Sequence, residues 1–326
     1  GNLLTVQGLD LVTDGTRSHM TGVINLNTWP ELYFDIATAF DVAPLKEIFF
    51  FGQNFTATGR GEYKGRFQKF QNGKYDVTGG FKVPGFNVSG LDFPQLSGRV
   101  VWMQNRLEVI GAESPFYGGK LRLSYVLDSH GGARGSIADL SATYKQVDMT
   151  EFGRVMNWQG IELASRADGW QTMRWPSGRF DQMSGDGEIR AQTADGRAIA
   201  AAQLPLAIVY APKEQPFLKD RPLGPVPVGG RVAYSLTPDR IELREGWLAT
   251  PETHLSFTGA TGWNDNANIP FRVVSTDWQA SDRLLAAVLT TFGSATSAIE
   301  IGGRGTFDGT LTKWFSRPLI VGKFEG

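Results

Sequence analysis

The strongest constraint on this chain is a short-range alternation of apolar and polar residues that returns along most of its 326 residues. The clearest run extends from Lys120 to Leu127, where leucine and tyrosine alternate with lysine, arginine and serine. A two-residue period places the apolar side chains of a strand on one face of a sheet. Glycine, with 40 residues, is well above its usual abundance and stands at turns and strand ends. The sequence therefore predicts a mainly β fold made of many short strands.

Two segments have the pattern of a β-hairpin. In the first, residues 98–103 and 106–110 flank Gln104 and Asn105, a two-residue connection typical of tight hairpins. Its apolar side chains are expected on one face: Val100, Trp102, Leu107 and Val109. The second hairpin covers residues 230–243, with its turn at 237–240. Consecutive strands are therefore expected to pair antiparallel.

Three short helices are expected between the strands, each with apolar residues at i, i+3 and i+4 that would lie on the sheet. The three triplets are Leu45/Ile48/Phe49, Phe152/Val155/Met156 and Leu285/Val288/Leu289. Pro44 suits the first turn of the first helix, and Asp148 with Glu151 has the spacing of a capping box for the second. For the third helix, Ser281 is the expected N-cap and Gly293 the expected end.

A glycine-spaced strand is repeated along the chain. Gly59–Phe70 and Gly303–Trp314 are identical at five of twelve positions, and Gly185–Ile189 is a weaker copy. With the hairpins and helices, these copies indicate a unit that recurs after about 120 residues. We expect one elongated segment, 1–326, with approximate repeats 1–70, 71–195 and 196–326. The proline-rich stretch Pro212–Pro227 is the expected linker or long loop, because proline cannot continue a central strand.

Composition excludes several classes of protein. The net charge is -1, so no basic excess favours a nucleic acid, and none is expected as a partner. The chain has no cysteine, which excludes disulfides and thiolate chemistry and fits a periplasmic or secreted location. No apolar run reaches the roughly 18 residues that span a bilayer. The chain begins and ends in strand-like sequence, so we expect an internal piece of a longer protein.

No pattern supports catalysis, a metal site or a cofactor. The three histidines, His19, His130 and His254, are far apart in the sequence, and the acidic residues are spread singly. The Gly59-x-Gly61 stretch precedes a strand, whereas the dinucleotide fingerprint opens a helix. Its glycines suit the bulges and twist of a curved sheet. We therefore expect a protein that is not an enzyme and that has no catalytic residue, metal or cofactor.

The apolar face of the strands is the remaining candidate site. It either packs on a second sheet as the core of a sandwich or lines a cavity, and the pattern alone leaves both alternatives open. The residues expected to line a cavity are those of the clearest alternating runs: Val100, Trp102, Leu107, Val109, Leu121, Leu123, Tyr125, Val232, Tyr234, Ile241, Leu243, Leu255, Phe257, Phe307 and Leu311.

The order of these parts resembles the AsmA-like proteins and their TamB-type members over essentially the whole chain. The similar features are the stretch Ser114–Leu121 with its aromatic-Gly-Gly step, the Gly-x-Val-x-Tyr hairpin, the strand Thr253–Gly259, and the steps Trp29-Pro30 and Trp175-Pro176. This resemblance implies a long antiparallel sheet curled into a taco-shaped groove lined with apolar residues. It also implies a periplasmic protein of the bacterial envelope, anchored in the inner membrane by sequence outside this chain.

The same resemblance implies the partners. Phospholipid acyl chains would slide along the groove between the inner and outer membranes, and the machinery that assembles outer-membrane proteins would be a further partner. The physics fits, since an acyl chain gains roughly 0.8 kcal/mol for each methylene that leaves water. A second hypothesis is an assembly module whose exposed sheet edge binds client strands by β-augmentation.

Overall fold

The computed structural model describes most of the chain. The described residues are 2–28, 31–50, 53–129, 135–158, 161–196, 224–263, 266–291, 298–299, 301–313 and 317–326. Several predicted features lie outside them: Trp29-Pro30, His130, Gly293, Trp314 and the larger part of Pro212–Pro227.

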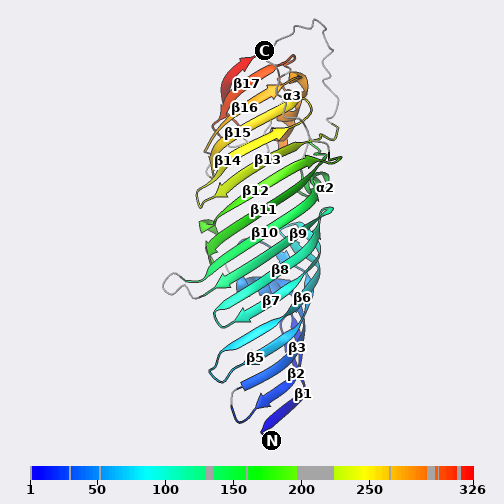
Figure 1. Cartoon of the computed structure of the whole chain (residues 1–326), viewed down its shortest axis with the longest axis vertical. Helices are drawn as coiled ribbons and strands as arrows, with labels where there is room; N and C mark the ends of the chain where they lie inside the picture. The colour runs from blue at the N-terminus through cyan, green and yellow to red at the C-terminus, as the bar shows by residue number, and fades with distance from the viewer. Residues whose placement is uncertain are drawn as a thin grey trace. The chain divides into compact units, whose positions relative to one another are not determined.

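The fold is mainly β, as predicted, with 65% of the described residues in strands. Among the described residues, 18 strands belong to one open antiparallel sheet, accompanied by three α-helices (Figure 1). Within the described residues no second sheet packs against it. In this part of the chain the apolar face is therefore not the interface between two separate sheets.

Contacts divide the chain into two compact units, described here one at a time. Unit 1 comprises Gly1–Tyr144 and Gln171–Ser184. Its elements are β1 (Leu3–Thr13), β2 (Thr16–Asn25), β3 (Glu31–Asp41), α1 (Val42–Phe49), β4 (Ala57–Thr58), β5 (Arg60–Lys69), β6 (Tyr75–Val88), β7 (Leu91–Met103), β8 (Arg106–Phe116), β9 (Gly119–Asp128) and the short 3-10 helix η2 (Phe180–Gln182).

Unit 2 comprises Lys145–Trp170 and Gly185–Gly326. Its elements are α2 (Met149–Val155), β12 (Ser184–Thr193), β13 (Gly229–Leu236), β14 (Arg240–Ala249), β15 (Thr253–Gly262), β16 (Ala267–Ser275), α3 (Trp278–Thr291), β17 (Gly305–Leu311) and β18 (Ile320–Glu325). Two further strands are divided between the units, β10 (Ile137–Asp148) and β11 (Ser165–Pro176), and the first residue of β12, Ser184, belongs to unit 1.

The predicted repeat boundaries remain a prediction. The order of parts after each helix differs between the copies, because α1 leads through the two-residue β4 to β5 and α3 leads to β17, whereas β11 stands between α2 and β12. The glycine-spaced segments nevertheless all form strands, in β5, β12 and β17.

Both predicted hairpins are confirmed. Strands β7 and β8 turn at Gln104 and Asn105, and their register places Val100 opposite Val109. Strands β13 and β14 turn between Leu236 and Arg240. Residues opposite each other in an antiparallel pair project to the same face, so the register assigns every side chain to a face.

Glycines on one face of unit 2 lie beneath aromatic rings of the neighbouring strand. Gly187 is opposite Tyr234 and Gly246 is opposite Phe257 in the register. A Cβ atom on Gly246 would lie 2.2 Å from the ring of Phe257, and one on Gly187 would lie 2.4 Å from the ring of Tyr234. The high glycine content therefore has a local cause, since the missing side chain makes room for the ring and the ring covers the bare backbone.

The three helices form where they are expected, but one predicted cap is wrong. Pro44 lies in the first turn of α1, and the Asp148 carboxylate accepts hydrogen bonds from the backbone N–H groups of Thr150 and Glu151. Helix α3 begins at Trp278, and it is Asp277 that accepts from Gln279 N and Ala280 N. Ser281 instead lies inside the helix and bonds to the sheet.

The helical triplets are less buried than predicted. Ile48, Val155 and Met156 are exposed, and Leu285 is 37% exposed. These side chains therefore do not pack on the sheet as expected. Leu289 of α3 is buried, in agreement with its triplet. Helices α1 and α2 have only 8 and 7 residues, so each offers few side chains to the sheet.

Candidate functional site

One face of unit 1 carries all the cavity-lining residues that the sequence predicts there. The register pairs Val100 with Val109, Trp102 with Leu107, and Val109 with Tyr125. Leu121 and Leu123 alternate with Tyr125 along β9, opposite Ser114 and Ala112 of β8. We call this side the apolar face of unit 1.

The apolar face of unit 1 continues to β1 through residues that sequence reasoning missed. Cross-strand partners lead from Val77 through Phe67, Phe34 and Gly22 to β1. In β1 the side chains on this face are Leu4, Val6, Leu9 and Leu11. A bulge between Val6 and Leu9 places one extra residue in the strand, so the residues after it alternate in the opposite phase. A strict two-residue period therefore does not group these four side chains on one face. The alternation of Phe34 and Ile36 in β3 was the available signal.

Part of this face is covered by the chain itself. Phe50, directly after α1, packs on Tyr125 with ring centroids 5.1 Å apart. It joins a cluster of Leu107, Tyr125, Ala138 and Trp175. Burial in this cluster raises the pKa of Tyr125, so its hydroxyl stays neutral. The predicted residues of β8 and β9 are therefore largely enclosed by protein atoms.

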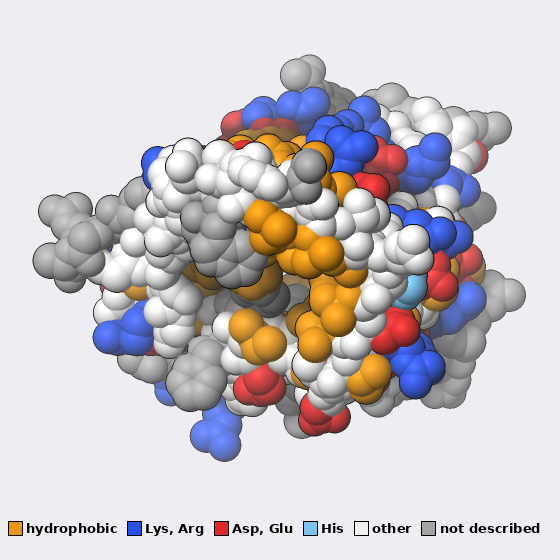
Figure 2. All heavy atoms as spheres, turned by 90° about the horizontal axis from the view of Figure 1, so that it is seen from below, with side chains coloured by type: hydrophobic (Ala, Val, Ile, Leu, Met, Phe, Trp, Pro, Cys, Tyr) orange, Lys and Arg blue, Asp and Glu red, His pale blue; other side chains and the backbone are white. Residues whose placement is uncertain are grey.

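The face is open at β1. Leu4 and Leu11 are each 50% exposed and Leu9 is 46% exposed. Viewed from the β1 end, hydrophobic side chains line part of a hollow, while most Lys, Arg, Asp and Glu side chains lie farther out (Figure 2). Large apolar side chains grouped in this way are uncommon on a soluble surface and usually mark a binding surface.

Unit 2 has an apolar face of its own, on which the register places all eight remaining predicted residues. Opposite pairs are Leu236 with Ile241, Tyr234 with Leu243, Phe257 with Phe271, and Val273 with Phe307. The predicted residues on it are Val232, Tyr234, Ile241, Leu243, Leu255, Phe257, Phe307 and Leu311. Leu311 belongs to a buried cluster with Ala267 and Ile269, and Phe257 packs against it.

Helix α3 packs on this face at one end of the strands. The Ser281 hydroxyl hydrogen-bonds to Thr253 at 2.5 Å and to Ser275 at 2.7 Å. Thr253 and Ser275 are opposite each other and continue the row of Leu255 and Val273. The ring of Trp278 packs against Phe324 of β18, with centroids 5.2 Å apart. The helix therefore covers the end of the face that Thr253 and Ser275 form.

The tyrosines of the apolar faces remain uncharged. Burial raises the pKa of Tyr63 in unit 1 to about 12, and it also raises the pKa of Tyr234 in unit 2. The Tyr63 hydroxyl is buried and has no hydrogen-bond partner among the described residues. These groups add polar atoms to the apolar faces without adding charge, which keeps the faces compatible with hydrocarbon.

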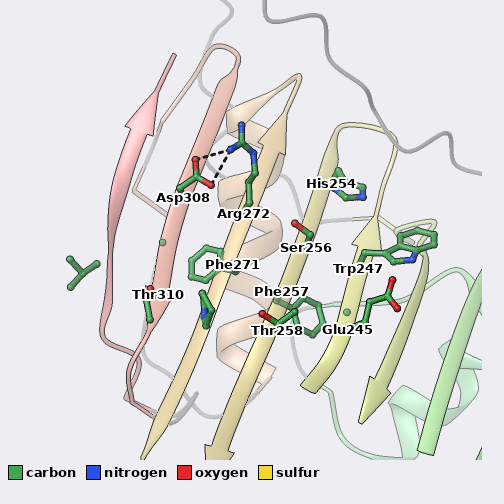
Figure 3. Close-up of a pocket in the computed structure, with 14 residues that line it drawn as sticks. Glu245, Trp247, His254, Ser256, Phe257, Thr258, Phe271, Arg272, Asp308 and Thr310 are labelled. Atoms are coloured by element: carbon green, nitrogen blue, oxygen red, sulfur yellow. Dashed lines mark hydrogen bonds and ion pairs between the residues drawn. The ribbon is translucent and has the colours of Figure 1, made fainter. Parts of the chain in front are cut away.

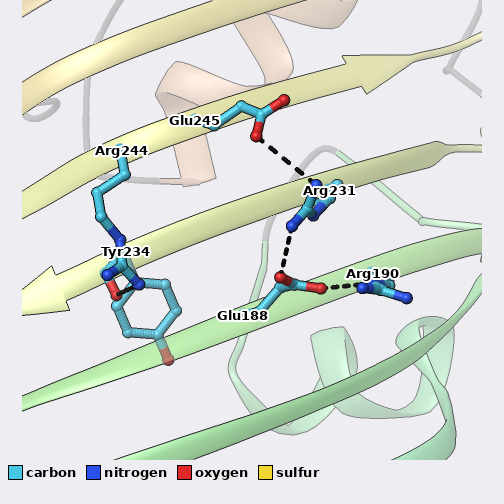
Figure 4. Close-up of polar contacts among 6 residues, drawn as sticks. All are labelled: Glu188, Arg190, Arg231, Tyr234, Arg244 and Glu245. Carbon is cyan, nitrogen blue, oxygen red and sulfur yellow. Dashed lines mark hydrogen bonds and ion pairs between the residues drawn. The ribbon is translucent and has the colours of Figure 1, made fainter.

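The opposite side of unit 2, which we call its polar face, carries a ladder of ion pairs (Figure 4). Glu188 of β12 binds Arg231 of β13 at 2.8 Å and also contacts Arg190. Arg231 reaches Glu245 of β14 at 3.6 Å. Hydrogen bonds from Arg231 and Arg190 lower the pKa of Glu188, and Glu188 raises the pKa of Arg231. The sheet is therefore amphipathic, with charge on one side and hydrocarbon on the other.

Comparisons with known proteins add no relative. Searches of protein-family models, curated proteins and solved structures found no match to this chain. The resemblance to AsmA-like proteins therefore stays a prediction. Among the described residues, no helix has both the length and the apolar character needed to cross a membrane.

Proposed function

We propose that the apolar faces bind phospholipid acyl chains and that the protein carries phospholipid between the inner and outer membranes of a bacterial envelope. The observation that supports this proposal best is the exposed apolar surface of β1, which continues through the same face of β2 and β3 towards the enclosed cluster of β8 and β9. A surface of this kind lowers the free energy of a hydrocarbon chain by roughly 0.8 kcal/mol per methylene removed from water. Binding of this kind needs no catalytic group.

The amphipathic sheet also indicates how a bound lipid would be oriented. Acyl chains would contact the leucine, phenylalanine and valine side chains of the apolar face, while a charged head group stays in water. On the opposite side of unit 1, exposed positions carry ion pairs such as Arg66 with Asp35 at 3.3 Å. A periplasmic location, with a membrane anchor outside this chain, belongs to the same proposal and rests on the family resemblance.

Neighbouring residues of β1 provide a matched test. Leu11 is opposite Ser18 on the apolar face, and Val12 is opposite Arg17 on the other side of the same strand. Both are exposed, at 50% and 65%. Leu11→Asp places a carboxylate in the acyl path, whereas Val12→Asp places it in water. The measurement is the amount of phospholipid that co-purifies with each protein, determined by mass spectrometry after gentle extraction.

We expect the unmodified protein and Val12→Asp to retain phospholipid and Leu11→Asp to lose most of it. Two results would contradict the proposal. One is an unmodified protein that binds no phospholipid when mixed with phospholipid vesicles. The other is an equal loss of lipid in the two variants, because a carboxylate on the side of β1 that faces away from the apolar face should leave the acyl path intact.

A second candidate function is the assembly of outer-membrane proteins by β-augmentation, and one observation favours it. Strand β1 is 11 residues long and almost wholly exposed, and among the described strands it pairs with β2. A long exposed edge of this kind offers unpaired backbone groups to an added strand. The variants above distinguish the two functions, because Leu11→Asp leaves the backbone of β1 in place. A variant that loses lipid but still binds an unfolded outer-membrane client would show that the edge acts independently.

A further inference from the structure

The polar face of unit 2 contains a broad, shallow depression across β14, β15, β16, β17 and β18 (Figure 3). Its volume is about 830 Å³. Helix α3 packs on the opposite side of the sheet, so the depression is separate from the proposed acyl path. None of the functions proposed above uses it.

A single row of side chains crosses the depression. The register places Trp247 opposite Ser256, Ser256 opposite Arg272, and Arg272 opposite Asp308. Four neighbouring strands lie three spacings apart, which at about 4.8 Å each gives roughly 14 Å from one end of the row to the other. The row is therefore long enough for a ligand of two or three six-membered rings.

The two ends of the row differ in chemistry. At one end, the ring of Trp247 lies near that of His254, with centroids 6.1 Å apart and planes only 13° from parallel. At the other end, Nη1 of Arg272 donates to both carboxylate oxygens of Asp308, at 3.1 and 3.3 Å. Between the two ends, the hydroxyl-bearing side chains of Ser256, Thr258 and Thr310 line the depression. An aromatic surface thus adjoins planar polar groups and hydroxyls.

The charges of the depression disfavour an anionic ligand. Asp308 neutralises Arg272, and Glu245 adds a carboxylate that pairs with Arg231. Burial lowers the pKa of His254, so its imidazole is neutral around pH 7. A phosphate would meet two carboxylates and one already paired guanidinium. A purely apolar ligand would leave the hydroxyls and the ion pair without water, which is unfavourable.

We propose that this depression binds a neutral oligosaccharide built of pyranose rings. A pyranose has one face of C–H groups, which packs on the electron-rich face of an indole ring, and a rim of hydroxyls. Those hydroxyls can donate to the Asp308 carboxylate and accept from Arg272, which keeps the paired groups satisfied. Ser256, Thr258 and Thr310 offer further donors and acceptors along the row. A sugar chain matches the aromatic ring, the hydroxyl groups and the length of the row together. An anionic ligand or a purely apolar ligand does not.

Two probes test the proposal: the tetramer of β-1,4-linked glucose and the tetramer of β-1,4-linked N-acetylglucosamine. Saturation-transfer NMR and calorimetric titration of the full chain report binding of each. Trp247→Ala should weaken binding by at least roughly tenfold, because an aromatic face in contact with a ligand contributes on the order of one factor of ten to affinity. His254→Ala, which leaves Trp247 in place, should weaken it less.

Trp263 provides the matched control, since it is an exposed tryptophan of the same unit, 49% exposed, that lies outside the depression. Trp263→Ala should bind the probes as the unmodified protein does, and circular dichroism of each variant checks that the sheet is intact. Absence of binding of both tetramers at millimolar concentration would overturn the proposal. So would equal binding by Trp247→Ala and Trp263→Ala.

Two further arms separate a sugar from other ligands. Inorganic phosphate and neutral phosphatidylcholine vesicles are titrated against the same proteins. Phosphate that competes with the tetramers and loses affinity in Arg272→Gln would replace the proposal with an anion site. Leu11→Asp should leave sugar binding unchanged, so a failure of lipid carriage and a failure of sugar binding remain distinguishable.

Discussion

Gly246 offers the sharpest test of how the amphipathic sheet is built. Glycines on the apolar face of unit 2 leave room for the aromatic ring opposite them. Gly246 is opposite Phe257, and its backbone does not adopt a left-handed conformation, so only space excludes a side chain. Gly246→Ala adds a single Cβ atom and leaves charge and backbone conformation unchanged.

The expected cost follows from the geometry. The added Cβ would lie 2.2, 2.4 and 2.7 Å from three atoms of the Phe257 ring. Carbon atoms in favourable contact are about 3.5 to 4.0 Å apart, so the ring must move by more than about 1 Å. Overpacking of this kind typically lowers the free energy of unfolding by about 1 to 3 kcal/mol.

A double-mutant cycle isolates the pair. Phe257→Ala removes the ring, which is half-buried, and should lower the free energy of unfolding by about 2 kcal/mol, less than for a fully buried phenylalanine. In Gly246→Ala/Phe257→Ala the new Cβ enters the space that the ring leaves. The double variant should therefore be about as stable as Phe257→Ala alone, with a coupling energy of about 1 to 3 kcal/mol. Urea denaturation followed by circular dichroism measures all four proteins.

Gly302→Ala is the control, because a Cβ there meets no atom within 4 Å and no left-handed backbone angle is recorded for the residue. It should leave stability unchanged or raise it slightly, since alanine loses less chain entropy than glycine on folding. The reasoning fails if Gly246→Ala is as stable as the unmodified protein. It also fails if the effects of the two substitutions simply add, because the glycine would then not be paired with the ring.

Two further predictions concern the polar face and α3. Glu188 has a pKa held below its usual range by Arg231 and Arg190, so its contribution to stability is complete above the ordinary glutamate range and is lost as the pH falls through the folded-state pKa. Glu188→Gln should therefore be less stable than the unmodified protein at pH 7, and denaturation curves of the two should converge in acid; a constant gap would contradict this. Asp277→Ala removes the acceptor for Gln279 N and Ala280 N and should lower the free energy of unfolding by about 1 kcal/mol, measured by urea denaturation. An unchanged stability would show that this cap is dispensable.

The sequence allowed the strands and their faces to be predicted where alternation is unbroken. Val100 and Trp102 share a face with Leu107 and Val109 because a two-residue turn fixes the register of β7 and β8. The N-cap of α3 could not be assigned in the same way. Asp277 and Ser281 are both residue types that cap helices. Ser281 lies inside the helix because its hydroxyl bonds to Thr253 and Ser275 of the sheet, and no sequence pattern predicts these contacts.

The candidate site was predicted only in part, for two physical reasons. Bulges such as that between Val6 and Leu9 shift the parity of a strand, so a regular pattern assigns its later residues to the wrong face. The second reason is that the periodicity of a strand does not show which of its apolar side chains other parts of the chain will cover. Phe50 and Tyr125 are remote in sequence and meet only after β3 to β9 have assembled, so which part of the apolar face stays open depends on tertiary contacts.

Where no second sheet packs on this one, as in the part of the chain that the structure describes, the two faces of the sheet must stabilise it, and they contribute in different ways. On the polar face, ladders such as Glu245, Arg231, Glu188 and Arg190 connect neighbouring strands and penalise a shift of register, since a slip of one residue would move the charges onto the apolar side. On the apolar face, glycine beneath an aromatic ring allows close packing within the sheet itself. Because this packing is completed between adjacent strands, it does not require a facing sheet. The apolar surface that remains at β1 is therefore available to a ligand without loss of the contacts that hold the strands together.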